Sequence, residues 1–237
     1  SARLLTGLLA TQNFESVLTG DSSLSSRPMK RIIEPLAKMN GEITSNNGKM
    51  PLKINGKELS NSEIDIKIPS AQIKSGVMLA ALNTNGRTKV IEHNVTRDHT
   101  EIMLEAFDSD IKITNQNSIK IIEINGKKEL KSKNIEVPSD LSSSAFFIIA
   151  TLINKKSKIF LKNININPTR NGILIALEKM GAKISYHNKK FLNNELVSDL
   201  EVVSSNLIGC ELDEDIAKLM IDEYPILSIA ACFASSP

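Results

Sequence analysis

The sequence repeats one layout three times, and this repetition limits the possible folds more than any other feature. Each copy contains a short β-branched run, a polar loop with an arginine, an amphipathic helical stretch and a small or turn-forming residue. The copies occupy residues 16–43, 88–111 and 157–184, and their arginines are Arg27, Arg97 and Arg170. A period of about 70 residues indicates a repeated supersecondary unit. It also places a cation beside three helix N-termini, an arrangement suited to anions.

A second set of segments alternates with these copies and predicts helices that are buried on most sides, because they are apolar nearly all round. These segments occupy residues 1–12, 69–86, 138–156 and 222–237. Shorter segments alternate apolar and polar residues, as half-exposed strands do; they are residues 62–69, 110–126 and 131–138. We therefore expect an α/β fold of repeated units, with outer sheets and buried apolar helices.

Composition excludes several classes of protein. The 237 residues are 41% hydrophobic and 24% charged, which is ordinary for a soluble protein. A net charge of +2 and 4% aromatic residues without Trp argue against nucleic-acid binding. Cys210, Cys232 and three scattered histidines do not form a zinc-binding pattern, which favours reduced thiols in a cytosolic protein. No apolar run is long enough to span a membrane, and no signal peptide is visible.

Both ends of the sequence lie next to apolar helical patterns. The chain begins with SARLLTGLLA, without an initiator Met, and stops at ACFASSP. We therefore expect it to be an internal piece of a longer protein.

The SLSSRPMKR loop is the first candidate site. Pro28 suits the first position of a helix, and Ser25 or Ser26 is able to cap its exposed N–H groups. An anion beside Arg27 would then meet the helix dipole and a guanidinium together. An ordinary surface arginine beside a capped helix fits these residues equally well.

The PSAQIKS segment is the second candidate. Ser70 begins a helix whose first turn carries Gln72 and Lys74, and polar groups at the mouth of a buried helix suggest a ligand contact. The segment alone favours a serine N-cap with solvated neighbours.

The TRDHTE and IDEYP segments follow. Thr96 or Asp98 is able to cap the next helix, and His99 has no partner residues that mark it as catalytic. Asp222 opens the last apolar helix beside Glu223; a carboxylate there favours a helix cap over a general base. Arg170 in NPTRN is a further cation, for which a structural role is favoured.

Six motifs in this order resemble one known family: GDSSLSSRPMKR, PSAQIKS, TRDHTE, PSDLSSSAFF, NPTRNGILIALEKMGAKI and DEYPILSIAA. Together they look like the 3-phosphoshikimate 1-carboxyvinyltransferases, or 5-enolpyruvylshikimate-3-phosphate (EPSP) synthases, and are similar to the bacterial class that includes glyphosate-tolerant members. The resemblance implies an enolpyruvyl transferase-like fold with two lobes, each of three βαβαββ units. Residues 1–137 would be a partial shikimate 3-phosphate-binding lobe with about two units. Residues 138–237 would be a partial second lobe with about one unit and the helix that follows it.

The resemblance also implies an activity. Family members transfer the enolpyruvyl group of phosphoenolpyruvate to the 5-hydroxyl of shikimate 3-phosphate and release phosphate, without a metal or organic cofactor. The reaction belongs to the shikimate pathway of aromatic amino acid biosynthesis. It implies a cytoplasmic enzyme that is monomeric when full length and binds neither nucleic acid nor a membrane.

Residue roles follow from the matched motifs. Shikimate 3-phosphate would contact Ser70, Gln72 and the backbone of Ala71, and its phosphate would contact Arg97. Phosphoenolpyruvate would contact Arg27 and Gln72. Asp222 would accept the proton of the 5-hydroxyl. The resemblance gives His99 and Arg170 no comparable role.

The match is incomplete at both ends. The family's Lys-Ser…Arg and N-x-G-T segments, including the loop that governs glyphosate sensitivity, would precede Ser1, and its Lys-Glu and Arg motifs would follow Pro237. We therefore expect the isolated chain to be inactive. The alternatives are UDP-N-acetylglucosamine 1-carboxyvinyltransferase, which shares the fold and chemistry, and a non-enzymatic repeat scaffold such as a nucleic-acid clamp. The apolar second set of helices argues against a clamp, which needs a basic inner surface.

Overall fold

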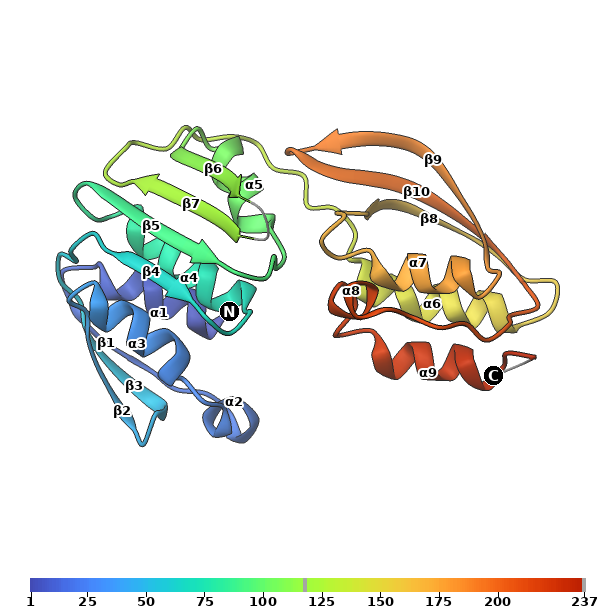
Figure 1. Cartoon of the computed structure of the whole chain (residues 1–237), viewed down its shortest axis with the longest axis horizontal. Coiled ribbons are helices and arrows are strands. Elements are labelled where there is room, and N and C mark those ends of the chain that lie inside the picture. Colours follow the sequence, from blue (N-terminus) through green and yellow to red (C-terminus); the bar gives the residue numbers. More distant parts are fainter. Residues whose placement is uncertain (117–118, 236–237) are drawn as a thin grey trace. The chain divides into compact units, whose positions relative to one another are not determined.

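The computed structural model describes residues 1–116 and 119–235, which form two compact units, Ser1–Lys133 and Asn134–Pro237 (Figure 1). Each unit has its own hydrophobic core. No helix in these described ranges has both the length and the apolar character needed to cross a membrane.

Unit 1, Ser1–Lys133, contains both helices and strands. Its helices are α1 (Ala2–Ala10), α2 (Ser22–Ser26), α3 (Lys30–Lys38), α4 (Ala71–Ala81) and α5 (His99–Ala106). Its strands are β1 (Glu15–Leu18), β2 (Glu42–Asn46), β3 (Lys49–Asn55), β4 (Glu63–Ile66), β5 (Arg87–Glu92), β6 (Asp110–Gln116) and β7 (Ile119–Asn125).

Unit 2, Asn134–Pro237, is smaller. Its elements are α6 (Leu141–Ile153), β8 (Lys158–Asn165), α7 (Gly172–Lys179), β9 (Lys183–Leu192), β10 (Glu195–Val203), α8 (Glu214–Lys218) and α9 (Tyr224–Cys232).

The threefold repeat predicted from the sequence is confirmed by the sheets. Each copy is a strand, an arginine-bearing loop, a helix and a hairpin, and the last strand of the copy lies in the middle of its three strands. The three sheets have the orders β1-β3-β2, β4-β5-β7-β6 and β8-β10-β9. Within each copy the strands pair antiparallel, while β4 joins the second sheet parallel to β5.

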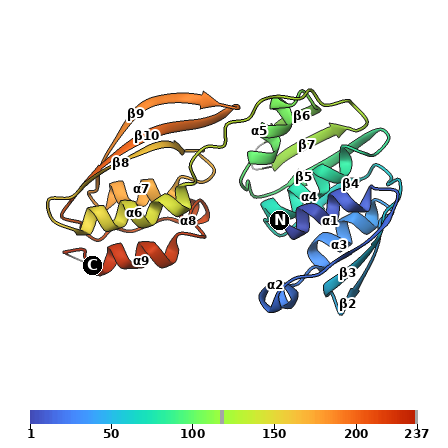
Figure 2. The same cartoon turned by 180° about the vertical axis from the view of Figure 1, so that it is seen from behind.

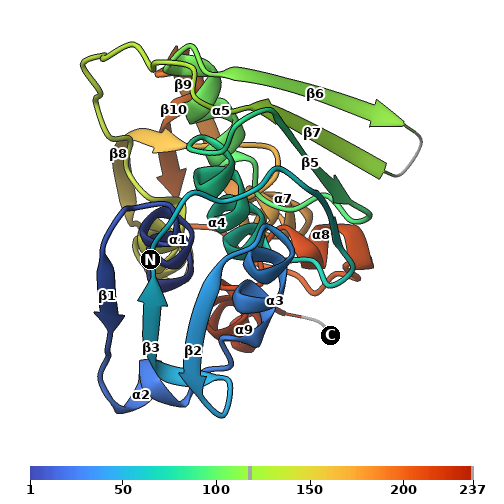
Figure 3. The ribbon, with the colours of Figure 1, turned by 90° about the vertical axis from the view of Figure 1, so that its left-hand side faces the viewer.

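The core of unit 1 lies between two sheets. Alternate residues of β3 and β7 are buried, as period-2 patterning requires of a sheet with one wet face. Helices α1, α3 and α4 lie between the β1-β3-β2 sheet and the β4-β5-β7-β6 sheet (Figure 3). Because α4 is enclosed on all sides, eight of its 11 residues are buried.

Helices α1 and α4 approach each other at two glycines. A Cβ atom added to Gly7 would lie 1.9 Å from the carbonyl oxygen of Gly76, so only glycine allows this contact. The close approach brings the start of α1 beside the start of α4.

The strand predicted for residues 131–138 is wrong. Residues 131–137 are exposed and form no strand, and Val137 is 83% exposed. The segment alternates apolar and polar residues, but no described strand pairs with its backbone; Asn163 of β8 reaches Glu136 only through its side chain. Only Ser139, just beyond it, makes an isolated bridge, to Ile164.

The expectation that all four apolar helices are buried on most sides is confirmed for α4 and, apart from one exposed stripe, for α6; it is not confirmed for α1 and α9. Phe146 and Phe147 of α6 are 59% and 61% exposed, and Phe233 after α9 is 58% exposed. In α1, Leu5 is 44% exposed. Figure 2 shows the reason in the described part of unit 2, residues 134–235: a single sheet covers α6 and α7 on one side, and α9 lies on their other side without a second sheet over it.

Candidate functional site

The N-terminus of α4 is built by a serine cap, as the sequence predicted. The Ser70 Oγ accepts a hydrogen bond from the backbone N–H of Ile73 at 3.4 Å. The side chain of Gln72 is exposed, and its Oε1 accepts a hydrogen bond of 2.5 Å from Nη1 of Arg3. Lys74 lies in the first turn of α4 but is not solvated, because its side chain is fully buried.

Three arginines gather at this end of α4. Burial lowers the pKa of Arg3, and the charges of Arg27 and Arg31 lower it further. Nη2 of Arg3 donates to the carbonyl oxygen of Pro28 at 3.0 Å. Within residues 1–116 and 119–235, these guanidinium groups form no ion pair with a carboxylate, and Nε of Arg3 is buried without a partner. The uncompensated positive charge suits an anionic ligand.

The local structure around Arg27 differs from the prediction. Ser25 and Ser26 belong to the short helix α2, which Asp21 caps by accepting from the N–H of Leu24 at 2.7 Å. Helix α3 begins only at Lys30 and has no side-chain cap. Arg27 follows α2 in an extended conformation, which holds it two residues before the N-cap position of α3.

Arg3 is the site residue that sequence reasoning missed. It lies in an apolar helical pattern with no motif of its own. The Gly7–Gly76 contact, which joins residues far apart in the sequence, brings its guanidinium close to Gln72.

The loop between β5 and α5 carries Arg97, which is half-buried. The capping prediction for this loop is wrong. The Thr96 hydroxyl donates to Glu92, and Asp98 occupies the N-cap position without a side-chain cap bond. His99 is simply the first residue of α5, as expected.

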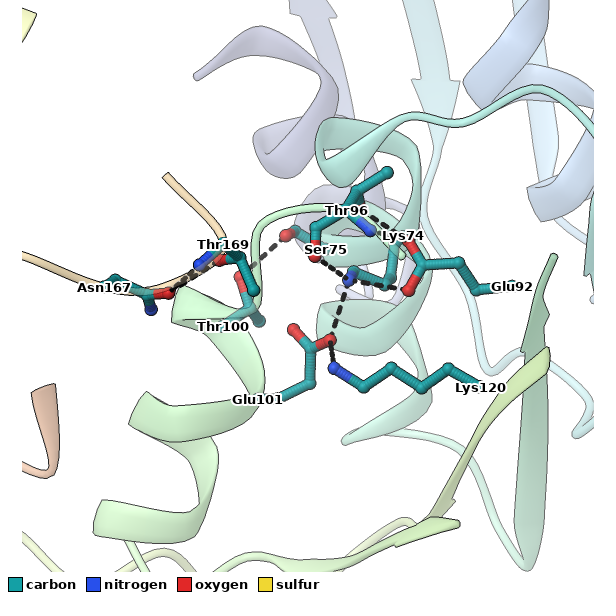
Figure 4. Close-up of polar contacts among 9 residues, drawn as sticks. All are labelled: Lys74, Ser75, Glu92, Thr96, Thr100, Glu101, Lys120, Asn167 and Thr169. Carbon is teal, nitrogen blue, oxygen red and sulfur yellow. Dashed lines mark hydrogen bonds and ion pairs between the residues drawn. The ribbon is translucent and has the colours of Figure 1, made fainter. Parts of the chain in front are cut away.

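The structure brings the PSAQIKS and TRDHTE segments together within unit 1 (Figure 4). The Ser75 Oγ lies 2.6 Å from Oγ1 of Thr100, and Nζ of Lys74 donates to the carbonyl oxygen of Thr96 at 3.4 Å. The candidate residues Ser70, Gln72 and Arg97 therefore flank one set of direct contacts between α4 and the start of α5.

Unit 2 contains the last candidate, Asp222. It is exposed and precedes Glu223, which takes the N-cap position of α9 without a side-chain cap bond, so the capping interpretation is wrong. Glu223 is 3% exposed and accepts a hydrogen bond from Oγ of Ser142. The backbone next to Asp222 is thereby tied to the first turn of α6.

Arg170 also belongs to this group in unit 2. Its Nη2 donates to Oγ of Ser142 at 2.5 Å and lies 3.5 Å from Oδ1 of Asp140. Burial raises the pKa of Asp140, but hydrogen bonds from Ser143 and the charge of Arg170 outweigh it and hold the pKa below its ordinary value. The preceding turn is closed by Asn167, whose Oδ1 accepts from the N–H and Oγ1 of Thr169, both at 2.7 Å (Figure 4).

Metal ligation is not supported by the side chains in residues 1–116 and 119–235. No group of three or more His, Cys, Asp or Glu side chains in these ranges is arranged to hold a metal ion.

Comparisons with known proteins match the whole chain to one family. A sequence model described as EPSP synthase (3-phosphoshikimate 1-carboxyvinyltransferase) matches residues 1–237. The 3-phosphoshikimate 1-carboxyvinyltransferase of Petrotoga mobilis is 49% identical over 232 residues, which are 97% of this chain and 53% of the relative. That of Ruthia magnifica is 46% identical over 235 residues, which are 99% of this chain and 53% of the relative. The chain thus spans about half the length of these curated relatives.

Solved structures agree. The EPSP synthase from Acinetobacter baumannii superposes with a TM-score of 0.85 at 43% identity, over 99% of this chain and 53% of that one. The enolpyruvyl transferase NikO from Streptomyces tendae superposes with a TM-score of 0.68 at 14% identity, over 97% of this chain and 53% of that one, which speaks for the fold alone.

Proposed function

Because the chain belongs to the EPSP synthase family, we propose that the protein containing it transfers the enolpyruvyl group of phosphoenolpyruvate to the 5-hydroxyl of shikimate 3-phosphate and releases phosphate. The chain has part of the enolpyruvyl transferase fold, so the prediction of an incomplete α/β repeat fold of this type is confirmed. The half of the length that its relatives add would supply the remaining substrate contacts.

The observation that carries the proposal is the group of arginines at the mouth of α4. Phosphoenolpyruvate has a carboxylate and a phosphate, and both need cationic partners. Arg27 and Gln72 are the proposed ligands of this substrate, and Arg3 lies near both of them. Arg3 holds Gln72 in place, and its own charge adds to the attraction for the anion.

Shikimate 3-phosphate is proposed to bind to the PSAQIKS and TRDHTE segments. Ser70, Gln72 and the backbone of Ala71 would contact this substrate, and Arg97 would bind its phosphate. The contacts between α4 and the start of α5 support this assignment, since they place both segments in one rigid structure.

Asp222 is the proposed general base. In this reaction the 5-hydroxyl oxygen attacks C2 of phosphoenolpyruvate while C3 takes up a proton, which gives a tetrahedral adduct. Loss of phosphate from C2 and of a proton from C3 then restores the double bond. An exposed carboxylate on a fixed backbone suits removal of the hydroxyl proton. Its neighbour Glu223 is excluded from this role because it is buried against Ser142.

Location and assembly are part of the same proposal. We place the whole enzyme in the cytoplasm as a monomer, with its two anionic substrates as its partners. Unit 1 would belong to the shikimate 3-phosphate-binding lobe and unit 2 to the other lobe.

Turnover by a completed protein tests the proposal. The 237 residues replace the matching part of Acinetobacter baumannii EPSP synthase, which supplies the sequence on both sides. We expect phosphate release with phosphoenolpyruvate and shikimate 3-phosphate, and none when UDP-N-acetylglucosamine replaces the latter. Release only with the UDP-sugar would show that the alternative activity is the correct one. Absence of release with either acceptor in a folded protein would refute an enolpyruvyl transferase.

Two controls accompany this assay. The Asp222→Asn variant of the completed protein should release at least about 100-fold less phosphate, since general-base catalysis contributes about 10²–10⁴-fold. The isolated 237-residue chain should be inactive.

A further inference from the structure

Four buried charged side chains form a connected group in unit 1, which we call the Lys74 network: Lys74, Glu92, Glu101 and Lys120 (Figure 4). Nζ of Lys74 lies 3.1 Å from Oε2 of Glu92 and 2.7 Å from Oε1 of Glu101. Nζ of Lys120 lies 3.1 Å from the same Oε1 of Glu101. Two positive and two negative charges therefore balance within the network.

The network is isolated from water. Lys74 is 0% exposed, Glu92 and Glu101 are each 1% exposed, and Lys120 is 6% exposed. Charges buried to this extent are expensive, and replacing a whole buried ionic group by apolar residues is often neutral or stabilising. Moreover, Oε2 of Glu101 is buried without a hydrogen-bond partner in the described part of the chain, which is a further cost. Stability alone therefore gives a poor account of these four side chains.

The network fixes the residue before Arg97 on both sides. Oε1 of Glu92 accepts hydrogen bonds from the backbone N–H of Thr96, at 2.9 Å, and from its hydroxyl. The carbonyl oxygen of Thr96 accepts from Nζ of Lys74. That carbonyl belongs to the peptide bond between Thr96 and Arg97, so Lys74 sets the orientation of this peptide and the starting direction of the Arg97 side chain.

The same lysine belongs to the helix that carries the other proposed ligands. Lys74 lies one turn after Ser70 in α4, and the neighbouring Ser75 contacts Thr100 of α5. Glu101 follows Thr100 in α5 and is paired with Lys74. The two segments are thus joined by contacts that involve both the side chains and the backbone next to Arg97.

We propose that the Lys74 network is a positioning device for the phosphate group of shikimate 3-phosphate. It acts through Thr96 and fixes the peptide bond before Arg97, so that the Arg97 guanidinium is oriented toward the phosphate position before the substrate binds. Pre-alignment of this kind increases affinity because less motion is lost on binding. The inference rests on the proposed function, which assigns the phosphate to Arg97.

Two substitutions at Thr96 test the link between the network and Arg97. Thr96→Val keeps the shape of the side chain but removes the hydroxyl that donates a hydrogen bond to Glu92, whereas Thr96→Ser keeps this hydroxyl. Binding to the completed protein is measured by calorimetric titration with shikimate 3-phosphate and, separately, with shikimate, which lacks the phosphate. We expect Thr96→Val to bind shikimate 3-phosphate about tenfold more weakly, the effect of one charge-assisted hydrogen bond. Thr96→Val should bind shikimate with nearly the wild-type affinity. Thr96→Ser should bind both ligands with nearly the wild-type affinity.

A second pair of variants separates positioning from stability. Lys74→Met removes the hub of the network, and Ile54→Ala removes side-chain volume from a fully buried position in β3, in the other sheet of unit 1. Both should lower the melting temperature of unit 1. Only Lys74→Met should weaken the binding of shikimate 3-phosphate relative to shikimate, and it should also speed amide exchange at Thr96 and Arg97.

The outcomes separate this inference from the proposed function. If the completed protein with the wild-type residues binds shikimate 3-phosphate and its Thr96→Val variant binds it equally well, the positioning role is wrong and the proposed function stands. An equal loss for shikimate and shikimate 3-phosphate would also overturn it, because the network would then be a general structural element. If the completed protein with the wild-type residues shows no preference for shikimate 3-phosphate over shikimate, the assignment of Arg97 to the phosphate fails, and the positioning role fails with it.

Discussion

Replacing Gly7 by alanine tests whether the contact between α1 and α4 builds the site. The added Cβ would lie 1.9 Å from the carbonyl oxygen and 2.7 Å from the carbonyl carbon of Gly76. An ordinary contact begins near 3.4 Å, so the helices must separate by up to about 1.5 Å. The obstacle is backbone, which no change of rotamer relieves.

Two effects of opposite sign determine the result. Alanine in a helix interior is favoured over glycine by about 1 kcal/mol. Overpacking of a core costs about 1–3 kcal/mol, and a clash with backbone belongs at the upper end of that range. We therefore expect Gly7→Ala to lower the free energy of unfolding of unit 1 by about 2 kcal/mol. For a unit of this size the melting temperature should fall by about 6–10 °C.

Calorimetry measures this change, and Leu8→Ala is the control. Leu8 lies next to Gly7 on the exposed side of α1, at 39% exposure, so its truncation should shift the melting temperature by much less. Separation of the helices should also lengthen the 2.5 Å hydrogen bond between Arg3 and Gln72. An unchanged or higher melting temperature for Gly7→Ala would mean that helix propensity dominates and that the contact is not tight.

Three further predictions concern single residues. Arg27→Ala in the completed enzyme should raise the KM for phosphoenolpyruvate by about 10–100-fold while binding of shikimate 3-phosphate changes little; an equal effect on both substrates in a folded protein would argue against the assigned role. Ser70→Ala should destabilise unit 1 by about 1 kcal/mol in thermal unfolding, and Ser70→Gly by a few tenths, because the N-cap is lost; equal losses would show that the hydroxyl does not cap. The lowered pKa of Asp140 stabilises unit 2 above the ordinary aspartate pKa of about 4, and this contribution disappears as the pH falls through the folded-state pKa. In the Asp140→Ala variant the melting temperature of unit 2 should therefore fall less steeply as the pH is lowered into the acid range. An unchanged pH dependence would show that the carboxylate does not stabilise the fold.

The repeat, the helices and most strands could be predicted because they depend on local pattern. Period-2 alternation in 110–126 became β6 and β7, and the apolar segment at 69–86 became α4. The same rule failed at 131–138, since alternation forms a strand only where another strand is free to pair with it. Apolar character likewise predicts that a helix face is stable when it is buried, but it does not tell whether other elements of the chain pack against that face, as the exposed Phe146 and Phe147 show.

The candidate site was predictable only where a motif lies in one segment. Ser70 caps α4 as its sequence context indicates. Arg3 has no local signal, because its role depends on a glycine contact between segments about 70 residues apart. Lys74 gave the wrong signal: a lysine in a first helical turn is usually solvated, and only the paired carboxylates of Glu92 and Glu101 allow it to be buried.

The central claim is that two cationic positions of unit 1 bind different anions. Arg97 binds the phosphate of shikimate 3-phosphate, and Arg27 binds phosphoenolpyruvate. A crystal structure of the 237-residue chain soaked with shikimate 3-phosphate alone tests this claim most directly. We predict the phosphate beside Arg97, with the ring at Ser70 and Gln72, and no substrate phosphate at Arg3, Arg27 and Arg31. A phosphate bound among those three arginines, with Arg97 unliganded, would contradict the account.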